Sequence, residues 1–171
     1  MSLLEKVLSA VTPSPEAGAP VDALTLLKND HDEVDALFED YEKLAEDDGA
    51  ARDRRELSTR ICGMLAVHAM IEEEIFYPAA RRAGVDADML DEADIEHGSA
   101  KQLIAEIGAS KASDSHYDAR VKVLGEYIHH HVKEEEGELF PACRKAGMDL
   151  DTLGARLQQR KDELMQKLAG A

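Results

Sequence analysis

Residues 68–86 read HAMIEEEIFYPAARRAGVD, and residues 131–149 read HVKEEEGELFPACRKAGMD. Aligned without a gap, the two stretches share His at the first position, Glu at the fifth and Pro at the eleventh. Both then continue with Ala, Arg and an Ala-Gly step that is followed two positions later by Asp. Since residues four apart lie on the same face of a helix, this repeat predicts two helices that carry the same polar pair on one face.

Apolar residues at spacings of three and four extend in both directions from this repeat and predict further helices. The apolar stripes cover residues 24–41, 57–79, 90–107, 121–139 and 150–168. Two of them end in Arg81-Arg82-Ala83-Gly84 and Arg144-Lys145-Ala146-Gly147, where basic residues suit a helix C-terminus and glycine suits the left-handed residue that follows it. Because the connections are short, consecutive helices should pack antiparallel.

The predicted fold class is therefore all-α. We expect an antiparallel four-helix bundle over residues 21–147, preceded by a short N-terminal helix and a proline-rich linker within residues 1–20. An amphipathic C-terminal helix within residues 148–171 would pack on the bundle or on a partner subunit.

Composition and charge exclude several classes of function. The 171 residues are 44% hydrophobic, which suits one compact domain, and the formal net charge is −16. Such a charge argues against binding to nucleic acid and to an anionic membrane surface. The sequence contains no apolar run of the roughly 20 residues needed to span a bilayer, and its N-terminus lacks the pattern of a signal peptide. We therefore expect a cytoplasmic protein whose two cysteines, Cys62 and Cys143, are reduced core thiols.

Each of the first four helices places one histidine in its inward stripe, and two of these helices add a glutamate four residues later. The six residues are His31, His68, Glu72, His97, His131 and Glu135. A buried, ionised carboxylate without a partner costs several kcal/mol or more, and imidazoles are mostly neutral at pH 7. A pair of cations would satisfy all six side chains. Mixed His and carboxylate ligands suit iron, manganese or zinc, and the lack of thiolates disfavours a structural zinc site.

The motifs that carry these side chains are Asp30-His31, His68-Ala-Met-Ile-Glu72, Glu96-His97 and His131-Val-Lys-Glu-Glu135. In this order, from about residue 24 to residue 147, they resemble the HHE cation-binding (hemerythrin-like) domain. The resemblance implies a four-helix bundle around a non-haem di-iron centre with an oxo or hydroxo bridge.

The resemblance also implies a division of the ligands. His31 and His68 would bind one iron, and His97 and His131 would bind the other. Glu72 and Glu135 would bridge the two irons.

One position departs from the family's oxygen carriers, which have a fifth histidine four residues after the one in the third helix. Here that position is Lys101, which cannot bind a metal while it is protonated. The second iron would then have an open position or another ligand, for which Glu73, Glu96 and a water are the candidates.

The remaining histidines and acids have ordinary structural roles as their first interpretation. His116, His129 and His130 should lie at the surface, and so should the acidic residues Glu73, Glu74, Glu134 and Glu136. Some of these acids could instead orient a ligating imidazole from outside the centre. Tyr77 and Phe140 occupy equivalent places in the repeat, and packing is the default role for both.

The sequence favours a di-iron protein that binds O2, NO or peroxide, for example as a sensor. The alternatives are a di-iron enzyme with catalase-like or peroxidase-like activity, and an iron-handling or iron–sulphur repair module. The expected partner is a small diatomic or peroxide ligand, and the chain could be a monomer or a homodimer. The sequence does not choose between these oligomeric states.

Overall fold

The structure is a computed structural model that describes residues 21–47 and 50–170. The N-terminal helix and linker expected within residues 1–20 lie outside the described residues. All regular structure in the described part is helical, as predicted. The elements are α2 (Ala23–Glu46), α3 (Ala51–Ile71), η1 (Glu72–Phe76), α4 (Tyr77–Arg82), α5 (Ala87–Ala109), α6 (Tyr117–Glu134), η2 (Glu135–Leu139), α7 (Phe140–Lys145) and α8 (Leu150–Gly170).

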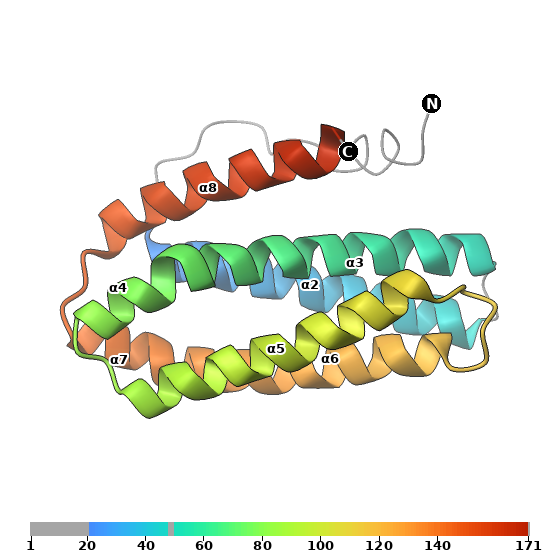
Figure 1. The fold of residues 1–171 in the computed structure, drawn as a ribbon, viewed down its shortest axis with the longest axis horizontal. Helices are drawn as coiled ribbons and strands as arrows, with labels where there is room; N and C mark the ends of the chain where they lie inside the picture. The colour runs from blue at the N-terminus through green and yellow to red at the C-terminus, as the bar shows by residue number, and fades with distance from the viewer. Residues whose placement is uncertain (1–20, 48–49, 171) are drawn as a thin grey trace.

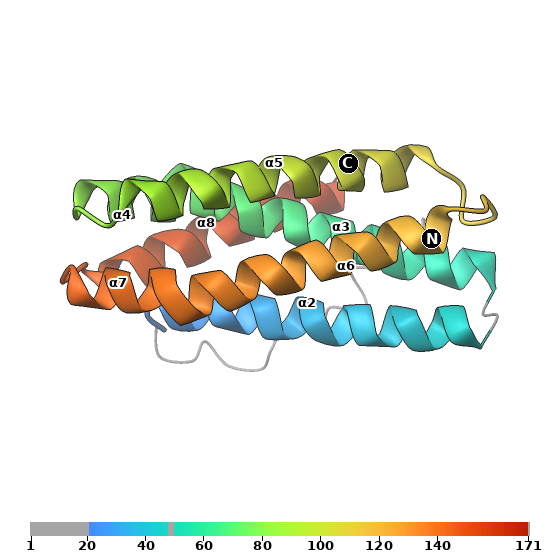
Figure 2. The ribbon, with the colours of Figure 1, turned by 90° about the horizontal axis from the view of Figure 1, so that it is seen from below.

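Four long rods form an antiparallel bundle (Figures 1 and 2). They are α2, α3 continued by η1 and α4, α5, and α6 continued by η2 and α7, and consecutive rods run in opposite directions. None of the described helices is long and apolar enough to cross a membrane.

Local interactions of the chain define several helix ends. Asp22 begins α2 by accepting hydrogen bonds from the backbone N–H groups of Leu24 and Thr25. Gly84 and Gly147, which follow α4 and α7, have φ angles of 82° and 69°. Only glycine adopts this region without a steric penalty, so both Ala-Gly steps end their helices as the sequence predicted.

The middle of each repeat differs from a regular helix. Residues 72–76 and 135–139 form π-helical turns, in which the N–H of Tyr77 bonds to the carbonyl of Glu72 and the N–H of Phe140 to that of Glu135. Each turn is followed by a proline, which has no N–H to donate and whose ring clashes with the carbonyl four residues earlier. A widened turn accommodates that proline within a continuous rod.

Two apolar clusters fill the bundle. One contains Leu27, Ile71, Phe76 and Leu90 near the α4 and α7 end. The other contains Ile61, Ile107 and Leu124 towards the opposite end. Along α2, α5 and α6, the inward histidine lies between residues of the two clusters, and on α3 His68 is flanked by Val67 and Ile71 of the first cluster, so apolar residues pack on both sides of the polar layer.

Helix α8 packs along α2, α3 and η1 (Figure 1). It buries Leu153, Leu157 and Leu164 against them. Gly154 marks a close crossing, because a Cβ there would stand 2.2 Å from the backbone oxygen of Val21. Helix α8 therefore contacts two rods of the bundle within the same chain.

Candidate metal centre

The bundle brings all six predicted donor residues into one buried layer. Each of them is at most 8% exposed. The histidines form two close pairs, with 3.1 Å between the Nε2 atoms of His31 and His68 and 3.3 Å between those of His97 and His131. One pair comes from α2 and α3, and the other comes from α5 and α6.

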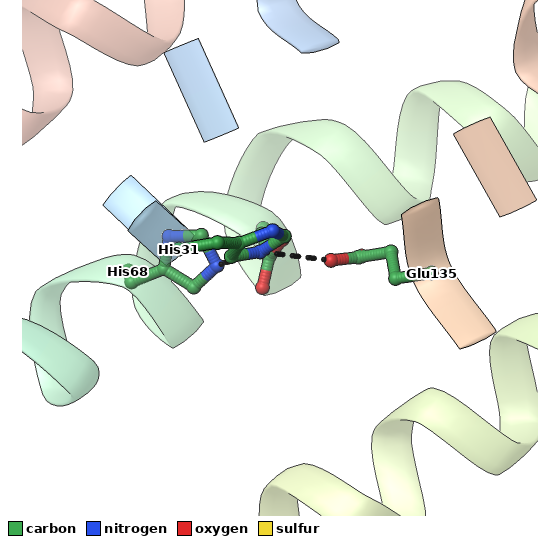
Figure 3. Close-up of side chains that lie close together, drawn as sticks. His31, His68 and Glu135 are labelled. Carbon is green, nitrogen blue, oxygen red and sulfur yellow. Dashed lines mark hydrogen bonds and ion pairs between the residues drawn. The ribbon is translucent and has the colours of Figure 1, made fainter. Parts of the chain in front are cut away.

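Glu72 lies between the two pairs. Its Oε1 atom is 3.2 Å from Nε2 of His68, and its Oε2 atom is 3.3 Å from Nε2 of His97. Glu135 faces His31, with 3.2 Å between Oε2 and Nε2 (Figure 3). These donors fall into two groups that could each hold a cation, and Glu72 belongs to both of them.

Two of the carboxylate oxygens are poorly satisfied. Among the described residues, Oε1 of Glu72 and Oε2 of Glu135 make no hydrogen bond of good geometry, and imidazole Nε2 atoms face them at 3.2 Å. Both glutamates are at most 3% exposed, so their charge needs a positive partner, which is either a proton on the facing imidazole or a metal cation. The arrangement of nitrogen and carboxylate donors therefore fits the metal centre that the sequence predicts.

The outer nitrogen of every site histidine faces a carboxylate. These contacts are His31 Nδ1 to Glu136 at 2.9 Å, His68 Nδ1 to Asp30 at 3.3 Å, His97 Nδ1 to Glu73 at 3.0 Å and His131 Nδ1 to Glu96 at 2.6 Å. Such a carboxylate holds the ring orientation and directs Nε2 towards a metal. All four imidazoles are therefore oriented with Nε2 towards the interior of the bundle.

This arrangement changes the interpretation of the acidic residues. Glu73 and Glu96, two of the candidates for the position of the fifth histidine, contact imidazole Nδ1 atoms and do not face the centre. Lys101 donates to both carboxylate oxygens of Glu73 at 2.6 Å. Glu73 and Glu136, which were expected to be part of a solvated face, instead each orient a histidine.

The sequence did not single out Tyr77 as a site residue, because packing was its default role. The side chain is 2% exposed, and its hydroxyl donates to Oε1 of Glu135 at 3.0 Å and lies 3.3 Å from Nε2 of His97. In a regular α-helix, a residue five places after Glu72 would point about 140° away from it. The π-helical turn largely removes that offset. A π-helical turn predicted before Pro78 would therefore have placed Tyr77 on the same face as Glu72.

The two halves of the layer differ at this position. Phe140, the repeat equivalent of Tyr77, stacks on His31 with ring centroids 5.9 Å apart and planes 10° apart. An oxygen donor therefore lies next to His97, and a hydrocarbon ring lies next to His31. Two bound cations would have unequal surroundings.

The carboxylates also change the proton affinities in the layer. Burial by itself lowers the pKa of an imidazole, but Glu72 and Asp30 raise the pKa of His68 to about 10. Burial likewise opposes the charge on Glu72, yet His68 and His97 hold the pKa of this carboxyl well below its usual range. Burial, followed by the charges of Glu72 and Glu135, raises the pKa of the Tyr77 hydroxyl well above its ordinary value. In the metal-free layer, protonated imidazole therefore compensates for part of the carboxylate charge.

The groups that were expected to lie outside the centre do so. His116, His129 and His130 are exposed. Cys62 and Cys143 are free thiols, and burial raises their pKa values to about 11 and about 12. Both cysteines therefore carry protonated thiols at neutral pH, in agreement with their predicted role in the core.

Comparison with known families agrees with this geometry. The model of the hemerythrin HHE cation binding domain matches residues 22–143, which include all six donors. The chain belongs to this family. Membership implies that it binds metal cations, and the two donor groups in the layer are where the structure could hold them.

The chain is similar to two further proteins. The crystal structure of a hemerythrin HHE cation binding domain-containing protein from Mycobacterium kansasii superposes with a TM-score of 0.72 at 20% identity, over 86% of this chain and 89% of that one. This match shows a shared fold. A protein named DNA nickase from Nostoc sp. (strain PCC 7120) is 26% identical over 147 residues, which are 85% of this chain. The HHE chain spans only 40% of the length of that relative.

Proposed function

We propose that this HHE protein is a non-haem di-iron protein whose centre binds O2, NO or peroxide. The observation that carries the proposal is Glu72, whose two oxygens each face a different pair of histidines. A shared carboxylate of this kind suits two cations held side by side. Iron is the metal we favour, since the donors are imidazole and carboxylate, and zinc or manganese would fit the same donors.

Each of the six donor residues would have a defined role as a metal ligand. His31 and His68 would hold one iron, His97 and His131 the other, and Glu72 and Glu135 would contact both. When bound, the irons would supply the capacity to bind and reduce O2 or peroxide. Tyr77 is placed to donate a hydrogen bond in the layer, because its raised pKa keeps the hydroxyl protonated.

The enzymatic alternative, a catalase-like or peroxidase-like reaction, is favoured by a cavity of about 410 Å³ that borders all four site histidines. An accessible position next to the centre is what a peroxide substrate requires. Iron handling and iron–sulphur repair stay as the third alternative. A function like the one named for the Nostoc relative is disfavoured, because a net charge of −16 opposes contact with DNA phosphates.

The test is the visible spectrum of the iron-loaded, reduced protein, recorded without air, then with air, and then with hydrogen peroxide. Bands that appear with O2 and persist support a binding or sensing role. Gas evolution with peroxide and return of the starting spectrum support the enzyme. Failure to take up two irons per chain would contradict the proposal.

A further inference from the structure

The cavity beside the centre is large for the small ligands considered so far. Its volume is about 410 Å³, and His31, His68, His97 and His131 lie along it. A water molecule occupies about 30 Å³ in the liquid, and O2 and hydrogen peroxide are only somewhat larger. An engineered apolar cavity of about 150 Å³ in another protein binds benzene, so this cavity has room for a larger organic molecule.

Beyond the imidazoles the walls of the cavity are mostly hydrocarbon. The apolar lining comes from Val34, Met64, Leu65, Ala100, Ile104 and Ile128. These side chains belong to α2, α3, α5 and α6, and Met165 of α8 also lines the cavity. Apolar walls favour an apolar body, at about 25 cal/mol per Å² of apolar surface removed from water.

The charged side chains that line the cavity already have partners. Lys161 of α8 is paired with Asp30, Lys101 with Glu73, Glu33 with Arg60, and Asp162 with Gln158. A charged ligand would have to compete with these contacts, whereas an uncharged ligand would leave them intact. The cavity therefore suits a neutral molecule.

These features together define a ligand: one polar end for the imidazole wall and a neutral hydrocarbon body for the remaining walls. We propose that the cavity binds uncharged organic hydroperoxides, with the peroxide group towards the four histidines and the hydrocarbon body among the apolar side chains. The inference rests on the proposed function, since it takes the metal centre to be where the peroxide group is bound.

The first experiment measures binding without redox chemistry. The probe is 2-phenyl-2-propanol, the alcohol that corresponds to cumene hydroperoxide, titrated by calorimetry into the metal-free and the zinc-loaded protein. We expect binding of one probe per chain. Ala100→Leu, which adds a side chain to the cavity, should weaken that binding at least tenfold. Ala105→Leu makes the same change at an exposed position of α5 and should leave it unaltered.

Melting curves accompany each titration, and Ile104→Phe is a second variant that fills the cavity should Ala100→Leu fail to fold. Absence of probe binding to the wild-type chain would overturn the inference. So would equal affinities for the wild type and a folded cavity-filling variant.

The second experiment separates this inference from the proposed function. The iron-loaded protein is titrated with cumene hydroperoxide and with hydrogen peroxide, and the change in the visible spectrum is followed. We expect cumene hydroperoxide to reach half-saturation at a concentration at least ten times lower. A response to hydrogen peroxide alone would overturn the inference and leave the di-iron proposal standing. No response to either peroxide, in a chain that still binds the probe, would overturn the hydroperoxide assignment and remove peroxide from the ligands of the proposed function, which the response to air then tests separately.

Discussion

Loading the metal-free protein with iron should raise its free energy of unfolding, and two buried carboxylate oxygens of the centre indicate by how much. Among the described residues, the buried oxygens Oε1 of Glu72 and Oε2 of Glu135 make no hydrogen bond of good geometry, although imidazole Nε2 atoms face them at 3.2 Å. An unsatisfied buried group costs about 1–3 kcal/mol, and more when it is charged. Satisfying both oxygens should therefore raise the free energy of unfolding by about 2–6 kcal/mol. For a chain of this size, that corresponds to a rise in Tm of roughly 5–20 °C.

The assay is thermal and urea unfolding of the metal-free and iron-loaded proteins under anaerobic conditions, across a series of free iron concentrations. Stabilisation by a ligand that binds only the folded state grows with the logarithm of its free concentration, reaching about 4 kcal/mol at a thousand times Kd. Magnesium serves as the control cation, because it prefers oxygen ligands and the centre is rich in imidazole.

A matched pair of variants links this effect to the centre. Glu135→Gln removes a buried carboxylate of η2, and Glu138→Gln makes the same change at an exposed position of the same turn. We expect Glu135→Gln to lose more than half of the stabilisation by iron, with the metal-free form at least as stable as wild type, since a buried charge has gone. Glu138→Gln should behave as wild type. Equal melting temperatures with and without iron in the wild-type chain would refute the reasoning.

Three further predictions concern the groups around the centre. Tyr77→Phe removes the 3.0 Å hydrogen bond to Glu135 and should lower the free energy of unfolding of the metal-free protein by about 1–3 kcal/mol. Urea unfolding measures this change, and an unchanged value would contradict the assigned contact. Asp30→Asn should weaken iron binding about 10- to 100-fold in a chelator competition, because Asp30 orients His68, whereas Asp32→Asn on the exposed side of α2 should not. Because the pKa of His68 is raised to about 10, its protonation stabilises the metal-free fold fully below about pH 6.5, and this contribution is lost as the pH rises through about 10. The free energy of unfolding in urea should therefore fall from pH 7 to pH 10, and a flat profile would contradict the assignment.

Local patterns in the sequence determined much of this protein. Spacings of three and four residues identify which face of each helix turns inward, because that spacing follows from the helix itself. They placed His68 and Glu72 on one buried face, and the structure agrees. The Ala-Gly steps located two helix ends, since the left-handed conformation at Gly84 and Gly147 depends on the local chain alone.

Only the tertiary structure decided what lies opposite those faces. Periodicity shows that His31 points inward, but its partner Glu136 is 105 residues away, on the rod formed by α6, η2 and α7. Helix periodicity also does not predict that the Tyr77 hydroxyl lies beside His97, because the π-helical turn before Pro78 shifts the register by one residue. The position of α8, and the cavity that it borders, likewise depend on contacts between rods. Such contacts arise from the packing of complete elements, which no single segment of the chain encodes.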